Sequence, residues 1–263
     1  MDIERLKAND CKELTAFLDR VFSAHNGYPM DFAAIFPRIF VETDETMGWY
    51  YAVKDNGRIV GTAASHPMYY RVAGETLKVS AGGNVAVAEE YRGQGIMQKL
   101  LNRINVDLEA EDFDFAFLHG DRKRYRTFGF ERCGKEYTVT FSRSMLKQLG
   151  ILGGDSFGDL RKEPQPVLAQ VLEISKQQIS GFERSTEDFI PALLAHRREP
   201  LVIRNAQKEI IGYVSLGAKE QYVAELGLKD PEDFPHVLMS ILDYAQIDSF
   251  AIRMPEYDCY SSY

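Results

Sequence analysis

The sequence predicts an α/β (α+β) protein with a mixed, largely antiparallel sheet and flanking helices, followed by a second, degenerate copy of the same arrangement. Asn56-Gly57 lies between two apolar runs, which is the strongest short-range signal of a β-hairpin. After strand-like residues at 85–87, apolar residues take helical spacing, and a strand at 113–119 must then return parallel by the right-handed crossover rule. A similar order of elements over residues 185–254 indicates the second copy.

The remaining elements of the first half follow from periodicity. An amphipathic helix is predicted over residues 10–23, and a loop followed by a short helix over 24–38. The apolar stripe of the first helix, interpreted as core, consists of Leu14, Phe17, Leu18, Val21 and Phe22. The strands are expected at 50–54, 58–70, 77–87, 113–119 and 135–141, the last of which closes the first domain.

Composition opposes several classes of function. The formal net charge of −8 and the isoelectric point near 5.3 oppose nucleic-acid binding and mildly favour a cationic substrate. The sequence has neither a signal-peptide pattern nor an apolar run of about 20 residues, so we expect a cytoplasmic protein without a membrane span. Cys11, Cys133 and Cys259 lie far apart without CxxC spacing, so we expect reduced thiols and no metal.

The segment Tyr91-Arg92-Gly93-Gln94-Gly95 joins the strand at 85–87 to the following helix. Its two glycines permit positive φ, which turns backbone N–H groups towards a ligand, and the helix N-terminus adds a positive partial charge. Arg92 adds a full charge beside them. The pattern by itself fits a phosphate-binding loop and a strand-to-helix turn with an exposed arginine equally well.

Two common glycine loops do not fit this segment. A Walker A loop requires Lys-Ser/Thr after its last glycine, and here Ile96-Met97 follow. A dinucleotide-binding loop requires a third glycine, where this sequence has Gln98, and it opens a βαβ unit, whereas this loop follows predicted hairpins.

The loop resembles the pyrophosphate loop of the GNAT N-acetyltransferases, whose signature is Arg/Gln-x-x-Gly-x-Gly/Ala after a Val-Ala-Val-like strand. Arg92 and Gly95 match it, and Met97 replaces the family's small residue. About thirty residues on, Tyr125-Arg126-Thr127-Phe128-Gly129-Phe130 resembles the family's Tyr-x-x-x-Gly-Phe element. In that family the tyrosine protonates the leaving thiolate of coenzyme A. Taken alone, Tyr125 is more simply a packing tyrosine, and the order and spacing of the two motifs favour the acid.

The segments Ala81-Gly82-Gly83-Asn84 and Leu118-His119-Gly120-Asp121-Arg122 are most similar to the enhanced-intracellular-survival (Eis) branch of that family. The resemblance covers about residues 1–145. Members of that branch end with a sterol-carrier-like third domain, for which 263 residues leave no room.

The resemblance implies the GNAT fold and an acetyl-CoA-dependent N-acetyltransferase that acts on a primary amine of a small cationic molecule or of a lysine side chain. In the family the two parallel strands splay apart, and freed backbone groups of the earlier strand pair with pantetheine. Tyr125 is the implied catalytic acid. The residues implied to bind acetyl-CoA are Val85, Ala86, Val87, Arg92, Gly93, Gln94, Gly95, Ile96 and Met97.

The general base is not identified. Many GNAT enzymes carry a strand glutamate at the position of Ala81, and His66, His119 and Glu42 are the alternatives. In Eis-like enzymes the terminal carboxylate is the base, which corresponds to Tyr263 here, although a frayed terminus is the simpler interpretation. The missing base keeps open a second hypothesis, a non-catalytic acyl-CoA-binding or sensing protein.

The domains are predicted at residues 1–149 and 164–263, joined by a glycine-rich linker at about 150–163. In the second domain, residues 229–233 replace the glycine loop with net negative charge that would repel a pyrophosphate. We therefore expect this domain not to bind coenzyme A, and instead to wall the acceptor pocket or to form a homo-oligomer contact.

Overall fold

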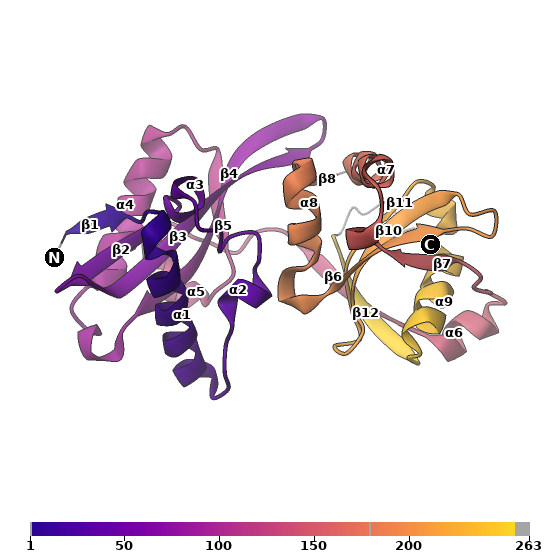
Figure 1. Cartoon of the computed structure of the whole chain (residues 1–263), viewed down its shortest axis with the longest axis horizontal. Coiled ribbons are helices and arrows are strands. Elements are labelled where there is room, and N and C mark those ends of the chain that lie inside the picture. Colours follow the sequence, from indigo (N-terminus) through magenta and orange to yellow (C-terminus); the bar gives the residue numbers. More distant parts are fainter. Residues whose placement is uncertain (1, 179, 256–263) are drawn as a thin grey trace. The chain divides into compact units, whose positions relative to one another are not determined.

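The computed structural model describes residues 2–178 and 180–255. The chain divides into two compact units, Met1–Arg132 (unit 1) and Cys133–Tyr263 (unit 2), and each unit has its own sheet (Figure 1). Within the described residues, no helix combines the length and the apolar character needed to cross a membrane.

Unit 1 contains a twisted sheet with helices on both faces. Its strands are β1 (Ile3–Arg5), β2 (Tyr50–Asp55), β3 (Arg58–Val72), β4 (Glu75–Val87) and β5 (Phe115–Leu118). Its α-helices are α1 (Cys11–Asn26), α2 (Phe32–Ile35), α3 (Asp44–Met47), α4 (Ile96–Ala110) and α5 (Arg122–Tyr125).

The strands of unit 1 lie in the order β1-β2-β3-β4-β5. β2, β3 and β4 pair antiparallel, and the first hairpin turn holds Asn56 and Gly57 at φ values of 48° and 75°, as a type I′ turn requires. β5 runs parallel to β4, so the predicted mixed sheet is confirmed. The parallel pairing joins residues 79–82 to 115–118, however, and not residues 85–87 as predicted.

Successive side chains of each strand point to opposite faces of the sheet, and each face is covered by a different helix. Tyr50 is buried with the α1 side chains, whereas its neighbour Tyr51 is buried with those of α4. α1 and α4 accordingly cover opposite faces of the sheet (Figure 1). The predicted core stripe of α1 is confirmed at Leu14, Phe17 and Leu18, which are fully buried.

Unit 2 repeats this arrangement. Its strands are β6 (Glu136–Ser142), β7 (Ser156–Asp159), β8 (Ser180–Phe182), β9 (Glu199–Arg204), β10 (Ile210–Gly217), β11 (Tyr222–Leu228) and β12 (Ser249–Pro255). Its α-helices are α6 (Arg143–Gln148), α7 (Gln165–Lys176), α8 (Thr186–Leu193) and α9 (Phe234–Ala245). The sequence β2-β3-β4-α4-β5 recurs as β9-β10-β11-α9-β12, with β12 parallel to β11, so the predicted second copy is confirmed.

The segment before α7 differs from the prediction. β6, expected to close the first domain, pairs antiparallel with β12, and β7, which lies in the expected linker, pairs with β9. Leu146 and Leu160 are buried in the hydrophobic cores of unit 2. Their packing fixes the segment between β6 and α7, whose glycine content had suggested a linker. The chain therefore divides between Arg132 and Cys133 and not in the predicted 150–163 linker.

Candidate active site

The loop between β4 and α4 has the backbone geometry of an anion-binding site. Gly93 and Gly95 have φ values of 78° and 75°, and Gly95 caps α4 without any side-chain hydrogen bond. A Cβ added to either glycine would meet no heavy atom within 4 Å, so the positive φ, and not crowding, requires glycine there. The Lys99 N–H donates to the Gly95 carbonyl at 3.0 Å, which leaves the preceding N–H groups of the first helical turn open to an acceptor.

The loop is anchored at one end by a hydrogen bond of Tyr91, and the cationic side chain of Arg92 follows this anchor. The Tyr91 hydroxyl donates to Asp55 Oδ2 at 2.6 Å, which ties the loop to the first hairpin. Arg92 is exposed and forms no ion pair with any residue in 2–178 or 180–255. Its guanidinium group is therefore available to an anion at the start of α4.

A cavity of about 740 Å³ lies at this loop. Its lining includes every residue predicted to bind acetyl-CoA except Gln94, namely Val85, Ala86, Val87, Arg92, Gly93, Gly95, Ile96 and Met97. The fold thus brings the strand end, the glycine loop and the helix N-terminus to one hollow within unit 1.

The end of β4 has a free edge at this cavity. Pairing with β5 stops at Gly82, and a bulge at residues 84–85, where Asn84 has a φ of 51°, interrupts the register with β3. The Ala88 N–H donates to the Val60 carbonyl of β3 at 2.9 Å, so the alternation of the strand turns the Val87 backbone groups away from β3. β5 has already ended there, and these groups face the splayed side of the sheet.

Tyr125 lies beside the cavity and not in its lining. The side chain is 8% exposed, and its ring packs on Gly120 and edge-on to Phe130, with ring centroids 6.3 Å apart. Burial raises the pKa of the Tyr125 hydroxyl, although the Arg124 guanidinium opposes this effect by its charge and by a hydrogen bond. The hydroxyl is consequently protonated at neutral pH, as a proton donor must be.

Among the described residues, none of the proposed general bases lines the cavity. Glu42 and His119 are exposed, and His66 is 5% exposed in the interior of unit 1. Burial lowers the pKa of His66 to about 4, so this imidazole is neutral at physiological pH. Tyr263 and Cys259 lie outside the described residues.

Several lining residues were not predicted. Val21, Phe22 and His25 reach the cavity from the last turns of α1, and Arg124, Thr127 and Phe128 reach it from the segment around Tyr125. Val21 and Phe22, interpreted as core, are only partly buried for this reason. The basic run Arg122-Lys123-Arg124 was the one sequence signal that could have identified a second cation near Arg92.

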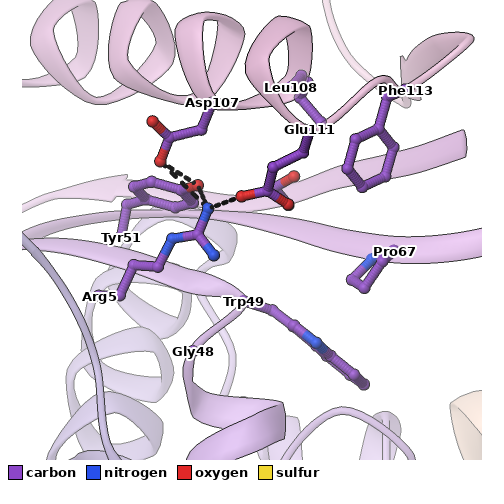
Figure 2. Close-up of a pocket in the computed structure, with 10 residues that line it drawn as sticks. Arg5, Gly48, Trp49, Tyr51, Pro67, Asp107, Leu108, Glu111 and Phe113 are labelled. Atoms are coloured by element: carbon purple, nitrogen blue, oxygen red, sulfur yellow. Dashed lines mark hydrogen bonds and ion pairs between the residues drawn. The ribbon is translucent and has the colours of Figure 1, made fainter.

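A second, smaller hollow of about 40 Å³ lies where β1 and β2 meet the end of α4 (Figure 2). Arg5 Nη2 donates to Glu111 Oε1 at 2.6 Å, to Asp107 Oδ2 at 3.1 Å and to the Tyr51 hydroxyl oxygen at 2.5 Å. The Tyr51 hydroxyl donates to Asp107 at 2.8 Å. These groups satisfy one another, so the network ties the strands to α4 and we assign no ligand to it.

The equivalent loop of unit 2 is acidic. Asp230 Oδ1 accepts the Glu232 N–H at 3.0 Å, and Asp233 Oδ1 lies 3.1 Å from His236 Nε2. Asp230 thus caps the short 3-10 turn Pro231–Asp233 that leads into α9, and three carboxylates precede α9 where glycines precede α4.

Residues 2–133 match the family model of the acetyltransferase (GNAT) domain. These residues make up half of the 263, and the chain belongs to the GNAT acetyltransferase family. An uncharacterized N-acetyltransferase, YhbS of Escherichia coli K12, is 34% identical over 80 residues, which is 30% of this chain and 47% of that protein. The chain spans about half the length of the curated relatives it matches.

Solved structures share the fold. A conserved Enterococcus faecalis V583 protein, described as a probable N-acyltransferase, superposes with a TM-score of 0.72 at 14% identity, over 97% of this chain and 65% of its own. Eis1 from Mycobacterium abscessus superposes with a TM-score of 0.66 at 16% identity, over 96% of this chain and 65% of its own. Saccharomyces cerevisiae N-myristoyltransferase with bound myristoyl-CoA superposes with a TM-score of 0.59 at 11% identity, over 96% of this chain and 76% of its own. These identities establish the GNAT fold alone, and membership of the Eis branch stays a prediction.

Proposed function

We propose that this protein transfers an acyl group, acetyl in the simplest case, from acyl-CoA to a primary amine. One observation carries the proposal. The uncapped start of α4, the free edge of β4 and the segment that holds Tyr125 converge on a single cavity in unit 1.

The groups around the cavity suit the parts of coenzyme A in turn. The pyrophosphate requires N–H donors and positive charge, which the first turn of α4, Arg92 and Arg124 supply. Pantetheine carries amides that pair with an open strand edge, which residues 85–87 supply. Acetyl-CoA is the cosubstrate in this proposal, and no metal takes part.

The chemistry is a direct acyl transfer. The amine nitrogen attacks the thioester carbonyl carbon, the C–S bond breaks, and the Tyr125 hydroxyl gives its proton to the departing thiolate. The ammonium product loses a proton to water or to a base that we do not assign. Backbone N–H groups at the bulge of β4 stabilise the negative charge that develops on the carbonyl oxygen.

The acceptor is a small cationic amine or the amine of a lysine side chain. The formal net charge of −8 supports this choice, since an acidic protein attracts a cation from solution.

A second candidate function is acyl-CoA binding without turnover. Tyr125, His66, His119 and Glu42 are all absent from the lining of the cavity, and this observation favours a sensor over an enzyme.

Free-thiol release from acetyl-CoA separates the two functions when it is measured with an aminoglycoside, a polyamine and a lysine peptide. Calorimetry with acetyl-CoA on the same protein completes the experiment. Turnover with any amine supports the enzyme, binding without turnover supports the sensor, and the absence of binding contradicts both.

A further inference from the structure

His66 is a buried polar residue on β3, and within residues 2–178 and 180–255 its side chain hydrogen-bonds only to Asn84 of β4. Its Nε2 lies 3.4 Å from Asn84 Oδ1, whereas its buried Nδ1 has no hydrogen-bond partner among the described residues. The Trp49 and Tyr50 rings stand edge-on to the imidazole, with centroids 5.7 and 5.3 Å away. The histidine is therefore enclosed by aromatic rings and tied to Asn84.

These contacts determine the tautomer of the imidazole. An amide oxygen only accepts hydrogen bonds, so the proton must lie on Nε2 of His66 for a bond to Asn84 Oδ1 to form. Nδ1 then carries an unpaired acceptor lone pair among the aromatic rings. Burying this acceptor costs less free energy than burying an N–H donor without a partner. Because burial keeps the ring neutral, the tautomer does not change around neutral pH.

Asn84 occupies the special position of the bulge. Ala64 pairs with Gly83 and Thr62 pairs with Ala86, so Asn84 and Val85 together oppose the single residue Ala63. The φ of 51° at Asn84 is a left-handed conformation that asparagine tolerates better than most residues but that glycine reaches more easily. A hydrogen bond that fixes the asparagine side chain therefore stabilises this particular bulge.

We propose that His66 is a positioning residue, which acts through Asn84 to hold the bulge that aims the backbone of residues 85–87 at the acyl group. This inference rests on the proposed function for its effect on catalysis. His66 does not itself touch the cavity, since neither it nor Asn84 is among the lining residues. The pyrophosphate contacts lie further along the chain, so the pair affects the reacting carbonyl more than the affinity for coenzyme.

The alternative is that His66 only fills space beneath Trp49 and Tyr50. The two roles differ in their dependence on Asn84. If His66 only fills space, replacing His66 and replacing Asn84 change kcat independently, so the two losses multiply. If His66 acts through Asn84, replacing His66 causes no further loss of kcat once Asn84 has been changed.

The test compares His66→Leu, His66→Gln, Asn84→Ala and the double variant His66→Leu/Asn84→Ala in the full chain. We expect His66→Leu and Asn84→Ala each to lower kcat about 10- to 100-fold, with KM for acetyl-CoA nearly unchanged, because the carbonyl is displaced from its donors. His66→Gln keeps an N–H donor and should recover most of the loss. The double variant should be no slower than the slower single variant. Wild-type kcat in a folded single variant, or losses that multiply, would overturn the proposal.

A readout that does not depend on turnover keeps the test decisive. Nitrogen-15 spectra of the imidazole in the free wild-type protein should show the proton on Nε2, and Asn84→Ala should move that signal. Both His66→Leu and Asn84→Ala should shift the same backbone amides at residues 84–87. If no amine is acylated by the wild-type protein, the enzymatic function fails, while these spectra still decide the role of the pair. A proton on Nδ1, or amides at 84–87 unchanged by His66→Leu, contradicts it.

Discussion

Ile96, the first residue of α4, lies directly against Gly61 of β3. A Cβ added to Gly61 would stand 2.5 Å from Ile96 Cγ2, closer than real contacts allow. The helix N-terminus at the candidate site is therefore positioned by a glycine in the preceding hairpin.

Gly61→Ala should push the start of α4 away from the sheet. We expect a loss of about 1–3 kcal/mol in the free energy of unfolding, the usual cost of overpacking, together with weaker acetyl-CoA binding. Denaturant unfolding and calorimetry measure the two effects. Gly83→Ala is the matched control for stability, because a Cβ there meets no heavy atom within 4 Å. Equal stability of the two variants would contradict the prediction.

Arg92→Glu should weaken acetyl-CoA binding by at least about 1.5–3 kcal/mol, the range of a charge-assisted hydrogen bond, without unfolding the protein. Calorimetry measures the affinity. Arg58→Glu, at the exposed start of β3, changes the net charge equally and should bind nearly as the wild type does. Unchanged affinity in a folded Arg92→Glu variant would remove the pyrophosphate assignment.

Tyr125→Phe removes only the hydroxyl group and keeps the ring that packs on Gly120. If the hydroxyl donates its proton in the transition state, kcat should fall about 10²–10⁴-fold, with acetyl-CoA affinity almost intact. Steady-state kinetics test this, with Tyr69→Phe at an exposed position as the control. A loss confined to KM would make Tyr125 a binding residue and not an acid.

The intact chain should bind one acyl-CoA. The start of α4 follows two glycines and Arg92, whereas the start of α9 follows Asp230, Glu232 and Asp233, whose negative charge repels a pyrophosphate. Calorimetric titration of the full chain gives the stoichiometry directly, and two equivalents per chain would show that unit 2 keeps a coenzyme site.

The stability of unit 2 should depend on His236. Its Nδ1 lies 2.9 Å from Asp155 Oδ2 and its Nε2 lies 3.1 Å from Asp233 Oδ1. Burial lowers the pKa of His236, but the hydrogen bonds to Asp233 and Asp155 outweigh this effect and the pKa is raised. The protonated ring is therefore favoured in the folded state.

The sign of the pH dependence follows from that shift. The stabilisation is fully present below the ordinary histidine pKa of about 6.5 and is lost as the pH rises through the raised folded-state pKa. Thermal unfolding midpoints should fall from pH 6 to pH 8 in the wild type and fall less in His236→Gln, with the exposed His119→Gln as the control. Identical pH profiles for wild type and His236→Gln would contradict this account.

The sequence by itself determined the features whose causes are local. The turn at Asn56-Gly57 and the glycine loop before Ile96 require positive φ, a property of single residues that is legible without a fold. The order of strands and helices around them followed from apolar spacing and from the handedness of the crossover. These signals located the candidate coenzyme residues, nearly all of which meet at one cavity.

The tertiary structure alone decided the features that depend on distant partners. β6 joins unit 2 because β12 offers it a strand edge, and periodicity carries no information about which edge is free. His25 of α1 and Arg124 of α5 line the same cavity as the end of β4, a proximity that spacing along the chain does not encode. The pairing of His66 with Asn84 likewise arises only once a bulge brings the two strands into their register, since a hydrogen bond between remote residues depends on the geometry that the whole sheet imposes.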